Sequence, residues 1–209
     1  MLRRVLPVGI AAALALVPSV AAAAPQEDGG SSTRQATQSL SYYAYGDVAL
    51  PDGRSAQVSL GQSRYAKGEW YSQLSLYLPS QCTPSGCTSS SSGYAQLDAD
   101  DVTFDRNLGR AVAEDVQVTL GSSSWGPGGY TSTQREVTVD VVFTGTGRTS
   151  RGTDHGECGE GGPDCKGVRV TAERPADLVL TVDGEPSTGT GVITRTFGVD
   201  IGAGGTGEG

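Results

Sequence analysis

Apolar and polar residues alternate along several segments of the chain, most clearly over residues 135–145. On one side of this segment the residues are apolar, and on the other they are polar apart from Val142. The two sets are Val137, Val139, Val141 and Phe143 against Glu136, Thr138, Asp140 and Thr144. Because successive side chains of a β-strand point to opposite faces, this pattern predicts a strand with one face on a core and one in water.

Shorter segments repeat this alternation and predict further strands. They cover residues 39–50, 56–60, 69–78, 94–99, 102–104, 111–120, 168–172, 178–182 and 193–201. Within the segment 111–120, the pattern places on one face Val112, Val116, Val118 and Leu120. The segments 121–133 and 145–167 lack the alternation and are rich in glycine or serine, which indicates long irregular loops.

Strands that are apolar on one face only must bury that face against a second layer. The turn pairs Asp52-Gly53 and Asp183-Gly184 separate neighbouring strands and favour antiparallel hairpins. No segment after residue 24 keeps the apolar spacing of three and four residues that an amphipathic helix shows. We therefore predict an all-β fold, an antiparallel β-sandwich, with a closed β-barrel as the alternative.

The start of the chain has the features of a secretory signal peptide, with Arg3 and Arg4, a short apolar run and small residues before Pro25. The apolar run is shorter than the roughly 20 residues that span a bilayer, so we expect no membrane anchor. The predicted organisation is a signal peptide over 1–24, a flexible linker over 25–38, a β-domain over 39–202 and a disordered glycine-rich tail over 203–209. The protein is expected to be secreted and extracellular.

The net charge of the chain is -8, and loss of the signal peptide removes two arginines. An acidic protein repels nucleic acids and anionic membrane surfaces, and no basic run offsets that repulsion. We therefore expect neither nucleic acid nor membrane as a partner, and expect the acidity to keep a secreted protein soluble.

The exported part holds an even number of cysteines, which predicts two disulfides; they are Cys82, Cys87, Cys158 and Cys165. The local pairing of Cys82 with Cys87 and of Cys158 with Cys165 would clip two short loops, each worth about 2 kcal/mol. A crossed pairing would close a longer loop worth about 4.5 kcal/mol, so loop-closure energy alone favours crossing. We favour local pairing because both pairs lie in Gly/Ser/Pro-rich loops that need closing.

Two stretches carry a resemblance to a known group. The run VTVDVVFTGTGRTSR over 137–151, followed by RVTAERPADLVLTVDG over 169–184, resembles a group of uncharacterised secreted bacterial β-domain proteins. In that group a valine-rich strand precedes a Thr-Gly turn, and a later strand ends in Asp-Gly. The resemblance covers the last third of the chain and implies no function.

His155 is the only histidine and lies among carboxylates. A lone histidine excludes a multi-histidine zinc site, and no Gly-x-Ser-x-Gly elbow accompanies it, so we predict no catalytic residue. The surrounding acids offer oxygens that suit calcium: Asp154, Glu157, Glu160 and Asp164. A second acidic group consists of Asp98, Asp100, Asp101 and Asp105. Neither matches a calcium-loop spacing, so solvated acids are the simpler interpretation, and no other cofactor is expected.

Aromatic residues give the best binding hypothesis. Tyr71 and Tyr77 lie opposite the apolar side of their predicted strand and should be exposed. Trp125 and Tyr130 fall in a glycine-rich segment, and further tyrosines cluster over 42–45. Exposed rings on a sheet can stack on sugars or anchor a protein partner, although tyrosines also cover sheets that bind nothing. We predict ligand binding at Tyr71, Tyr77, Trp125 and Tyr130.

Three functions are consistent with these observations. The preferred one is a non-catalytic extracellular binding or adhesion domain for a glycan or protein. The second is a secreted hydrolase inhibitor that presents a disulfide-clipped loop, since such a loop loses little entropy on docking. The third is a hydrolase that uses two carboxylates, for which the sequence singles out no pair.

Overall fold

The computed structural model describes residues 35–202 except 52, 81, 84–85, 88, 127–128 and 158–165. This part of the chain forms twelve strands and one short 3-10 helix, Ala99–Asp101. The strands are β1 (Gln35–Ala49), β2 (Ser55–Tyr65), β3 (Tyr71–Leu78), β4 (Cys82–Thr83), β5 (Gly86–Cys87), β6 (Ser91–Leu97), β7 (Val102–Phe104), β8 (Arg110–Gly126), β9 (Gly129–Gly145), β10 (Ser150–Glu157), β11 (Lys166–Val182) and β12 (Glu185–Gly202). The predicted all-β fold is confirmed, and the described residues contain no helix long and apolar enough to cross a membrane.

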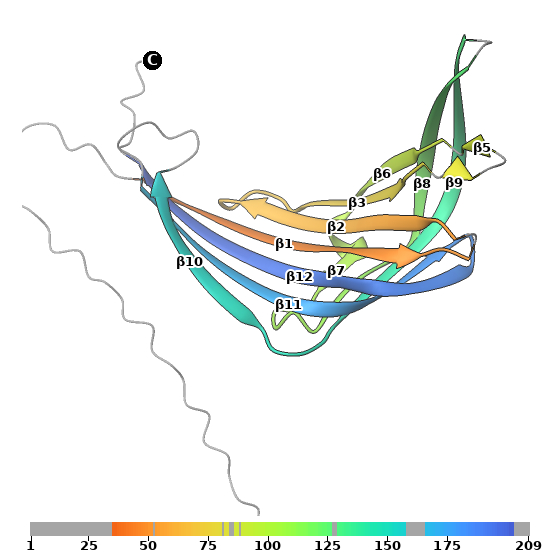
Figure 1. The fold of residues 1–209 in the computed structure, drawn as a ribbon. Coiled ribbons are helices and arrows are strands. Elements are labelled where there is room, and N and C mark those ends of the chain that lie inside the picture. Colours follow the sequence, from red (N-terminus) through yellow and green to blue (C-terminus); the bar gives the residue numbers. More distant parts are fainter. Residues whose placement is uncertain are drawn as a thin grey trace, which may run out of the picture. The chain divides into compact units, whose positions relative to one another are not determined.

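All strand pairs are antiparallel, as predicted. The main sheet runs in the order β10-β11-β12-β1-β2-β3-β6-β8-β7, and β9 pairs with both β8 and β11. The strand pairing therefore closes into a ring that runs from β11 through β12, β1, β2, β3, β6 and β8 and returns to β11 through β9 (Figure 1). One curved sheet thus folds over a single core. Its layers face each other as in a sandwich, and its closed strand pairing resembles that of a barrel. We call the side that carries the core the inner face and the opposite side the outer face.

The core is supplied by the alternation that the sequence shows. On β9, the apolar set that begins at Val137 and ends at Phe143 is at most 2% exposed. Other strands of the sheet add buried aliphatic side chains, among them Ala44, Val58, Leu60, Leu74, Leu76, Leu178, Leu180 and Ile193. Over the core, each long strand therefore buries its inner face and leaves its outer face free for other chemistry.

Strand β8 departs from the predicted alternation. A β-bulge shifts its register between Ala113 and Val116, and Asp115 has a φ of 58°. The Asp115 N–H donates to Asp140 Oδ1 on β9 at 2.7 Å. Because the extra residue changes the side to which later side chains point, Ala113 is buried and Val112 is not, contrary to the single face predicted for 112–120.

Strand β11 shares one of its edges between two partners. β10 pairs with it up to Glu173, and β9 pairs with it from Ala176 onward. Pro175 lies at the junction, where its carbonyl accepts a 2.6 Å hydrogen bond from the N–H of Thr146. Since the N and O of a strand residue point to the same edge, the missing N–H of Pro175 falls at this junction and costs no bond to β12.

Three segments differ from the predicted boundaries. β1 begins at Gln35, so the last residues of the predicted linker 25–38 belong to the sheet. The predicted loop 121–133 extends the β8–β9 hairpin, and part of the predicted loop 145–167 is strand β10. Residues 131–136 of β9 and 150–156 of β10 are exposed throughout. Backbone pairing therefore holds these two segments in the sheet, and their sequence shows no apolar alternation. The predicted signal peptide and tail lie outside the described residues.

The hairpin between β11 and β12 turns at Asp183-Gly184, as predicted. Both residues have positive φ, 51° and 84°, as a two-residue turn of this kind requires. The Asp183 side chain accepts a 3.0 Å hydrogen bond from the N–H of Thr138 and pairs with the Arg135 guanidinium. The Thr138 N–H first, and Arg135 second, hold the pKa of Asp183 below its ordinary value of 3.8.

Truncation of Phe143 tests the position of the core. Phe143 is fully buried, so Phe143→Ala should lower the free energy of unfolding by about 3–5 kcal/mol. The neighbouring exposed Thr144 provides the control, and Thr144→Ala should cost less than about 1 kcal/mol. Urea unfolding followed by tryptophan fluorescence measures both, and equal losses would contradict the placement of the core.

The Asp183 contact should make stability depend on pH. A carboxyl whose pKa is depressed in the folded state stabilises that state above its unfolded pKa, and this contribution is lost as the pH falls through the folded value. Asp183→Asn keeps a residue that tolerates positive φ but removes the charge. We expect the wild-type protein to be the more stable at neutral pH, with the difference shrinking below a pH of about 3.8. Thermal unfolding across pH measures it, and a constant difference would contradict this assignment.

A tyrosine groove as candidate functional site

A row of four outer-face residues crosses four neighbouring strands. Tyr45 on β1 lies opposite Ser59 on β2, which lies opposite Ser75 on β3, which lies opposite Tyr94 on β6. Since adjacent strands are about 4.8 Å apart, the Cα atoms of the two tyrosines are about 14 Å apart. Two aromatic side chains therefore stand at the ends of a floor made of small hydroxyl side chains.

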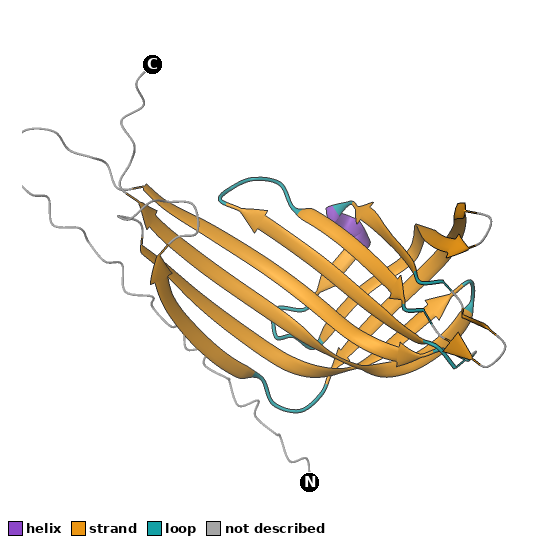
Figure 2. Cartoon of the chain, turned by 45° about the horizontal axis from the view of Figure 1, so that its top comes forward, coloured by secondary structure: helices purple, strands orange, loops and turns teal. Residues whose placement is uncertain are grey.

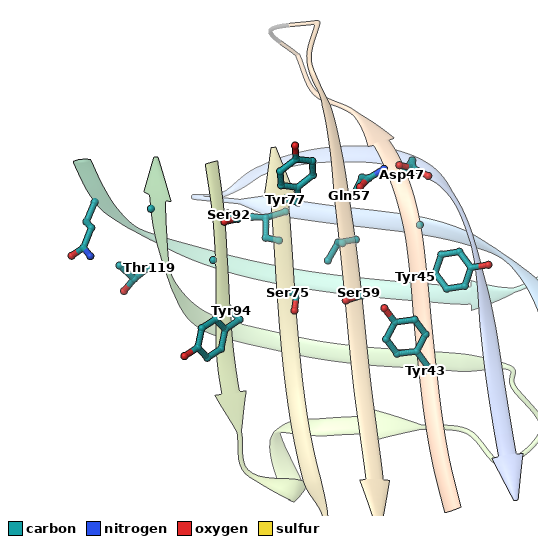
Figure 3. Close-up of a pocket in the computed structure, with 16 residues that line it drawn as sticks. Tyr43, Tyr45, Asp47, Gln57, Ser59, Ser75, Tyr77, Ser92, Tyr94 and Thr119 are labelled. Atoms are coloured by element: carbon teal, nitrogen blue, oxygen red, sulfur yellow. The ribbon is translucent and has the colours of Figure 1, made fainter. Parts of the chain in front are cut away.

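The rows on either side add two more tyrosines. On one side, Tyr43 of β1 lies opposite Gly61 of β2. On the other, Gln57 of β2 lies opposite Tyr77 of β3. Figure 3 shows these rings around the serines of the central row. The Tyr43 and Tyr45 rings are 5.8 Å apart between centroids, so they form one aromatic wall.

These residues line a groove of about 980 Å³, which we call the tyrosine groove. Its side chains on β1, β2, β3 and β6 are Tyr43, Tyr45, Asp47, Gln57, Ser59, Ser75, Tyr77, Ser92 and Tyr94. The four tyrosines are between 41% and 75% exposed, so their rings are accessible to a ligand. Thr119 and Gln134 of the β8–β9 hairpin complete the groove beyond β6.

Glycines allow the strands to take this shape. A Cβ at Gly93 of β6 would lie 2.4 Å from the carbonyl oxygen of Thr119 on β8, far too close for any side chain. Glycine thus lets β6 approach β8 and places the neighbouring Tyr94 at the end of the groove. At Gly61 the absence of a side chain leaves space for the Tyr43 ring, whose Cδ2 would be 3.4 Å from an added Cβ.

The chemistry of the groove is aromatic and polar, with little charge. Among its lining residues, Asp47 is the one charged side chain. Tyrosine rings offer apolar faces for stacking, and the serine, glutamine and tyrosine groups offer both donors and acceptors. The groove therefore suits a neutral ligand that has apolar faces and many hydroxyl groups.

The structure places the predicted aromatic site residues differently from one another. Tyr77 lines the groove. Tyr71 lies on the same face of β3 but beyond the groove, where its hydroxyl is 3.2 Å from the Gln73 carboxamide oxygen. Trp125 and Tyr130 lie opposite each other in the β8–β9 hairpin, and their side chains are outside the described part of the structure.

Sequence reasoning did not select the residues that complete the groove. The sequence singles out Tyr43 and Tyr45 only as part of a tyrosine cluster, and it does not single out Tyr94 or the two serines between the rings, Ser59 and Ser75. A sequence signal for Tyr94 existed, because it alternates with the apolar Ala95 and Leu97, as Tyr77 alternates with Leu76 and Leu78. The register that aligns residues of the four strands in one row is set by hydrogen bonds between strands, so no local sequence pattern predicts it.

The predicted calcium ligands are only partly described. Asp154 is exposed on β10, the backbone of Glu157 ends that strand, and Glu160 and Asp164 fall outside the described residues. Within the described part, no three metal-ligating side chains come together. His155 is exposed on β10, a strand and not the predicted loop, opposite Val168 on β11. Calcium binding stays a prediction.

The backbones of the first two cysteines are paired in a short two-stranded ladder. Cys82 and Cys87 lie directly opposite each other in the small β4–β5 ladder. Cys158 and Cys165 are outside the described residues, and the side chains of the first pair are not described. The local disulfide pairing therefore stays a prediction, and so does the inhibitor hypothesis that depends on it.

No protein-family model and no curated protein matches this chain. Among solved structures, the chain is similar to the crystal structure of an AttH candidate from Nitrosomonas europaea, with a TM-score of 0.36 and 11% identity. The match covers 82% of this chain and 53% of that one, so the chain spans about half the length of that protein. A likeness this distant assigns no function.

Substitution at Gly93 tests how the groove is built. Gly93→Ala forces the backbone of β6 away from Thr119 and should lower the free energy of unfolding by about 1–3 kcal/mol. Gly152 on β10 is the control, because an added Cβ there meets no atom within 4 Å. Gly152→Ala should change stability by less than about 1 kcal/mol. Chemical denaturation compares the two, and equal effects would contradict the close approach of β6 to β8.

Proposed function

We propose that this protein is a secreted, non-catalytic binding domain and that its tyrosine groove holds a glycan. The observation that carries the proposal is the row from Tyr45 through two serines to Tyr94, flanked by the rings of Tyr43 and Tyr77. Aromatic rings pack against the apolar faces of sugars, and the hydroxyl floor can exchange hydrogen bonds with sugar hydroxyls.

The composition of the groove favours a glycan over a protein partner. Protein interfaces concentrate their affinity in a desolvated cluster of large side chains, commonly aromatic residues and arginine. The floor here consists of Ser59 and Ser75, and no arginine lines the groove. The rings stand along its sides, which leaves an open polar channel between them and suits a hydroxyl-rich chain.

Hydrolysis by carboxylates is less well supported at this site. Glycosidases use two carboxyl groups on either side of the scissile bond, whether they retain or invert its configuration. Asp47 is the single carboxylate that lines the groove. The arrangement supports binding without cleavage, in agreement with the preference drawn from the sequence.

Alanine substitutions in the groove test the proposal. Tyr45→Ala or Tyr94→Ala should weaken glycan binding about tenfold or more, because each removes an aromatic end of the site. A glycan array with the secreted form of the chain would identify the ligand, and isothermal titration would then give the affinity of each variant.

Tyr71→Ala is the matched control, because Tyr71 lies on the same face of the same strand as Tyr77, is 48% exposed and does not line the groove. It should bind the glycan like the wild-type protein. Absence of any glycan ligand for the wild-type protein, or an equal loss in all three variants, would overturn the proposal.

A further inference from the structure

The inner face of the sheet continues beyond the core. β1, β10, β11 and β12 extend past the end of the neighbouring strands (Figures 1 and 2). Large apolar side chains remain 36–43% exposed on the inner face of this extension: Val168, Val170, Phe197 and Ile201. A contiguous exposed apolar surface marks a binding site more often than single scattered apolar residues do.

A row of basic residues lies where this apolar surface meets the core. Arg151 on β10 is opposite Ala172 on β11, which is opposite Arg195 on β12. Paired residues of adjacent strands point to the same face, and Ala172 is buried on the inner one. The small alanine therefore separates two arginines whose Cα atoms are about 10 Å apart.

A third arginine reaches the same place from the loop after β7. The guanidinium of Arg195 donates a 2.9 Å hydrogen bond from Nη1 to the carbonyl of Arg106, which ties that loop to β12. Together these residues form a cavity of about 570 Å³, which we call the arginine pocket. It is lined by Leu40, Tyr42, Arg106, Arg151, Val170, Ala172, Arg195 and Phe197.

The floor of the arginine pocket is fixed by packing. The Tyr42 ring is 8% exposed and stacks on Phe104 at 5.4 Å between centroids. Arg64 lies 4.8 Å over the Trp70 ring nearby, so that fourth cation already has an aromatic partner. The volume of the pocket falls within the range of about 300–1,000 Å³ that is usual for small-molecule sites.

Among the described residues, the arginines of the pocket, Arg106, Arg151 and Arg195, have no acidic side chain as an ion-pair partner. This cluster belongs to a chain whose net charge is -8, so it is a local exception to an acidic surface. Guanidinium groups bind carboxylates through paired charge-assisted hydrogen bonds, which suits a carboxylate ligand.

We propose that the arginine pocket binds a long-chain carboxylate, that is, a fatty acid. The carboxylate lies between Arg151 and Arg195, within reach of Arg106. The hydrocarbon chain runs outward along the strands, first over Val170 and Phe197, which come two residues beyond the arginines. It then passes Val168 towards the free end of the sheet. The arginine row matches the carboxylate. The apolar side chains beyond it, which share this face with Thr153, His155 and Lys166, match the hydrocarbon chain.

Other occupants of the same surface fit less well. A membrane surface would have to approach a protein whose overall negative charge repels anionic lipids. A second copy of this chain, docked about a two-fold axis, would bring the same arginines face to face without a counter-charge. A single carboxylate ligand avoids both costs. This site is separate from the tyrosine groove, and the inference does not rest on the proposed glycan binding.

Isothermal titration with dodecanoate and with dodecanol, both below their aggregation concentrations, tests the proposal on the chain without its predicted signal peptide. We expect saturable binding of dodecanoate that is at least about tenfold tighter than that of dodecanol, since only the acid can pair with the guanidiniums. Arg151→Gln should weaken dodecanoate binding about tenfold and leave dodecanol unchanged. Phe197→Ser should weaken the binding of both.

Arg169→Gln is the matched control, because Arg169 is exposed on the outer face of β11, one residue from Val168 and Val170. It should bind dodecanoate like the wild-type protein, and circular dichroism confirms that each variant folds. Equal affinity for acid and alcohol, no saturable binding, or an equal loss in Arg169→Gln would each overturn the proposal. So would binding confined to phosphatidylglycerol vesicles, or a dimer in gel filtration that Arg151→Gln alters.

Discussion

Burial of one face of a single antiparallel sheet is the constraint on which the rest of this structure depends. The long strands have apolar side chains on alternate positions only, so the sheet must curve until its inner face meets itself. Residues such as Phe143, Leu180 and Ile193 fill the space that results. Pairing of β9 with both β8 and β11 completes the curvature and removes most of the free edges that an open sheet would expose.

Curvature requires exceptions to regular strand geometry, and each has a local chemical cause. The bulge at Asp115 turns β8, with its N–H bonded to Asp140. Pro175 lies where β11 changes partners and has no ladder bond to lose. Gly93 permits a backbone approach that no larger residue allows. These residues give the sheet its shape but contribute little apolar surface, so they shape the core without being part of it.

The same arrangement creates two surfaces with different chemistry. The outer face is not needed for the core, and there four strands bring tyrosines and serines into one groove. β1, β10, β11 and β12 extend beyond the buried core, so part of their inner face stays exposed. There, apolar side chains and three arginines line one pocket. The tyrosine groove is rich in hydroxyls and has one charged side chain, and the arginine pocket is apolar and cationic, so the two favour ligands of different classes.

The sequence by itself determined the strands with a buried face, the Asp183-Gly184 turn and the outward direction of Tyr71 and Tyr77, because these follow from alternation and from the torsion angles that particular residues accept. It did not reveal β10, whose described residues are exposed and show no alternation, or the extension of the β8–β9 hairpin. Only the tertiary structure decided that Tyr45, Ser59, Ser75 and Tyr94 form one row, and that Arg106, Arg151 and Arg195 meet. The physical reason is that register and sheet closure arise from hydrogen bonds between segments far apart in the chain.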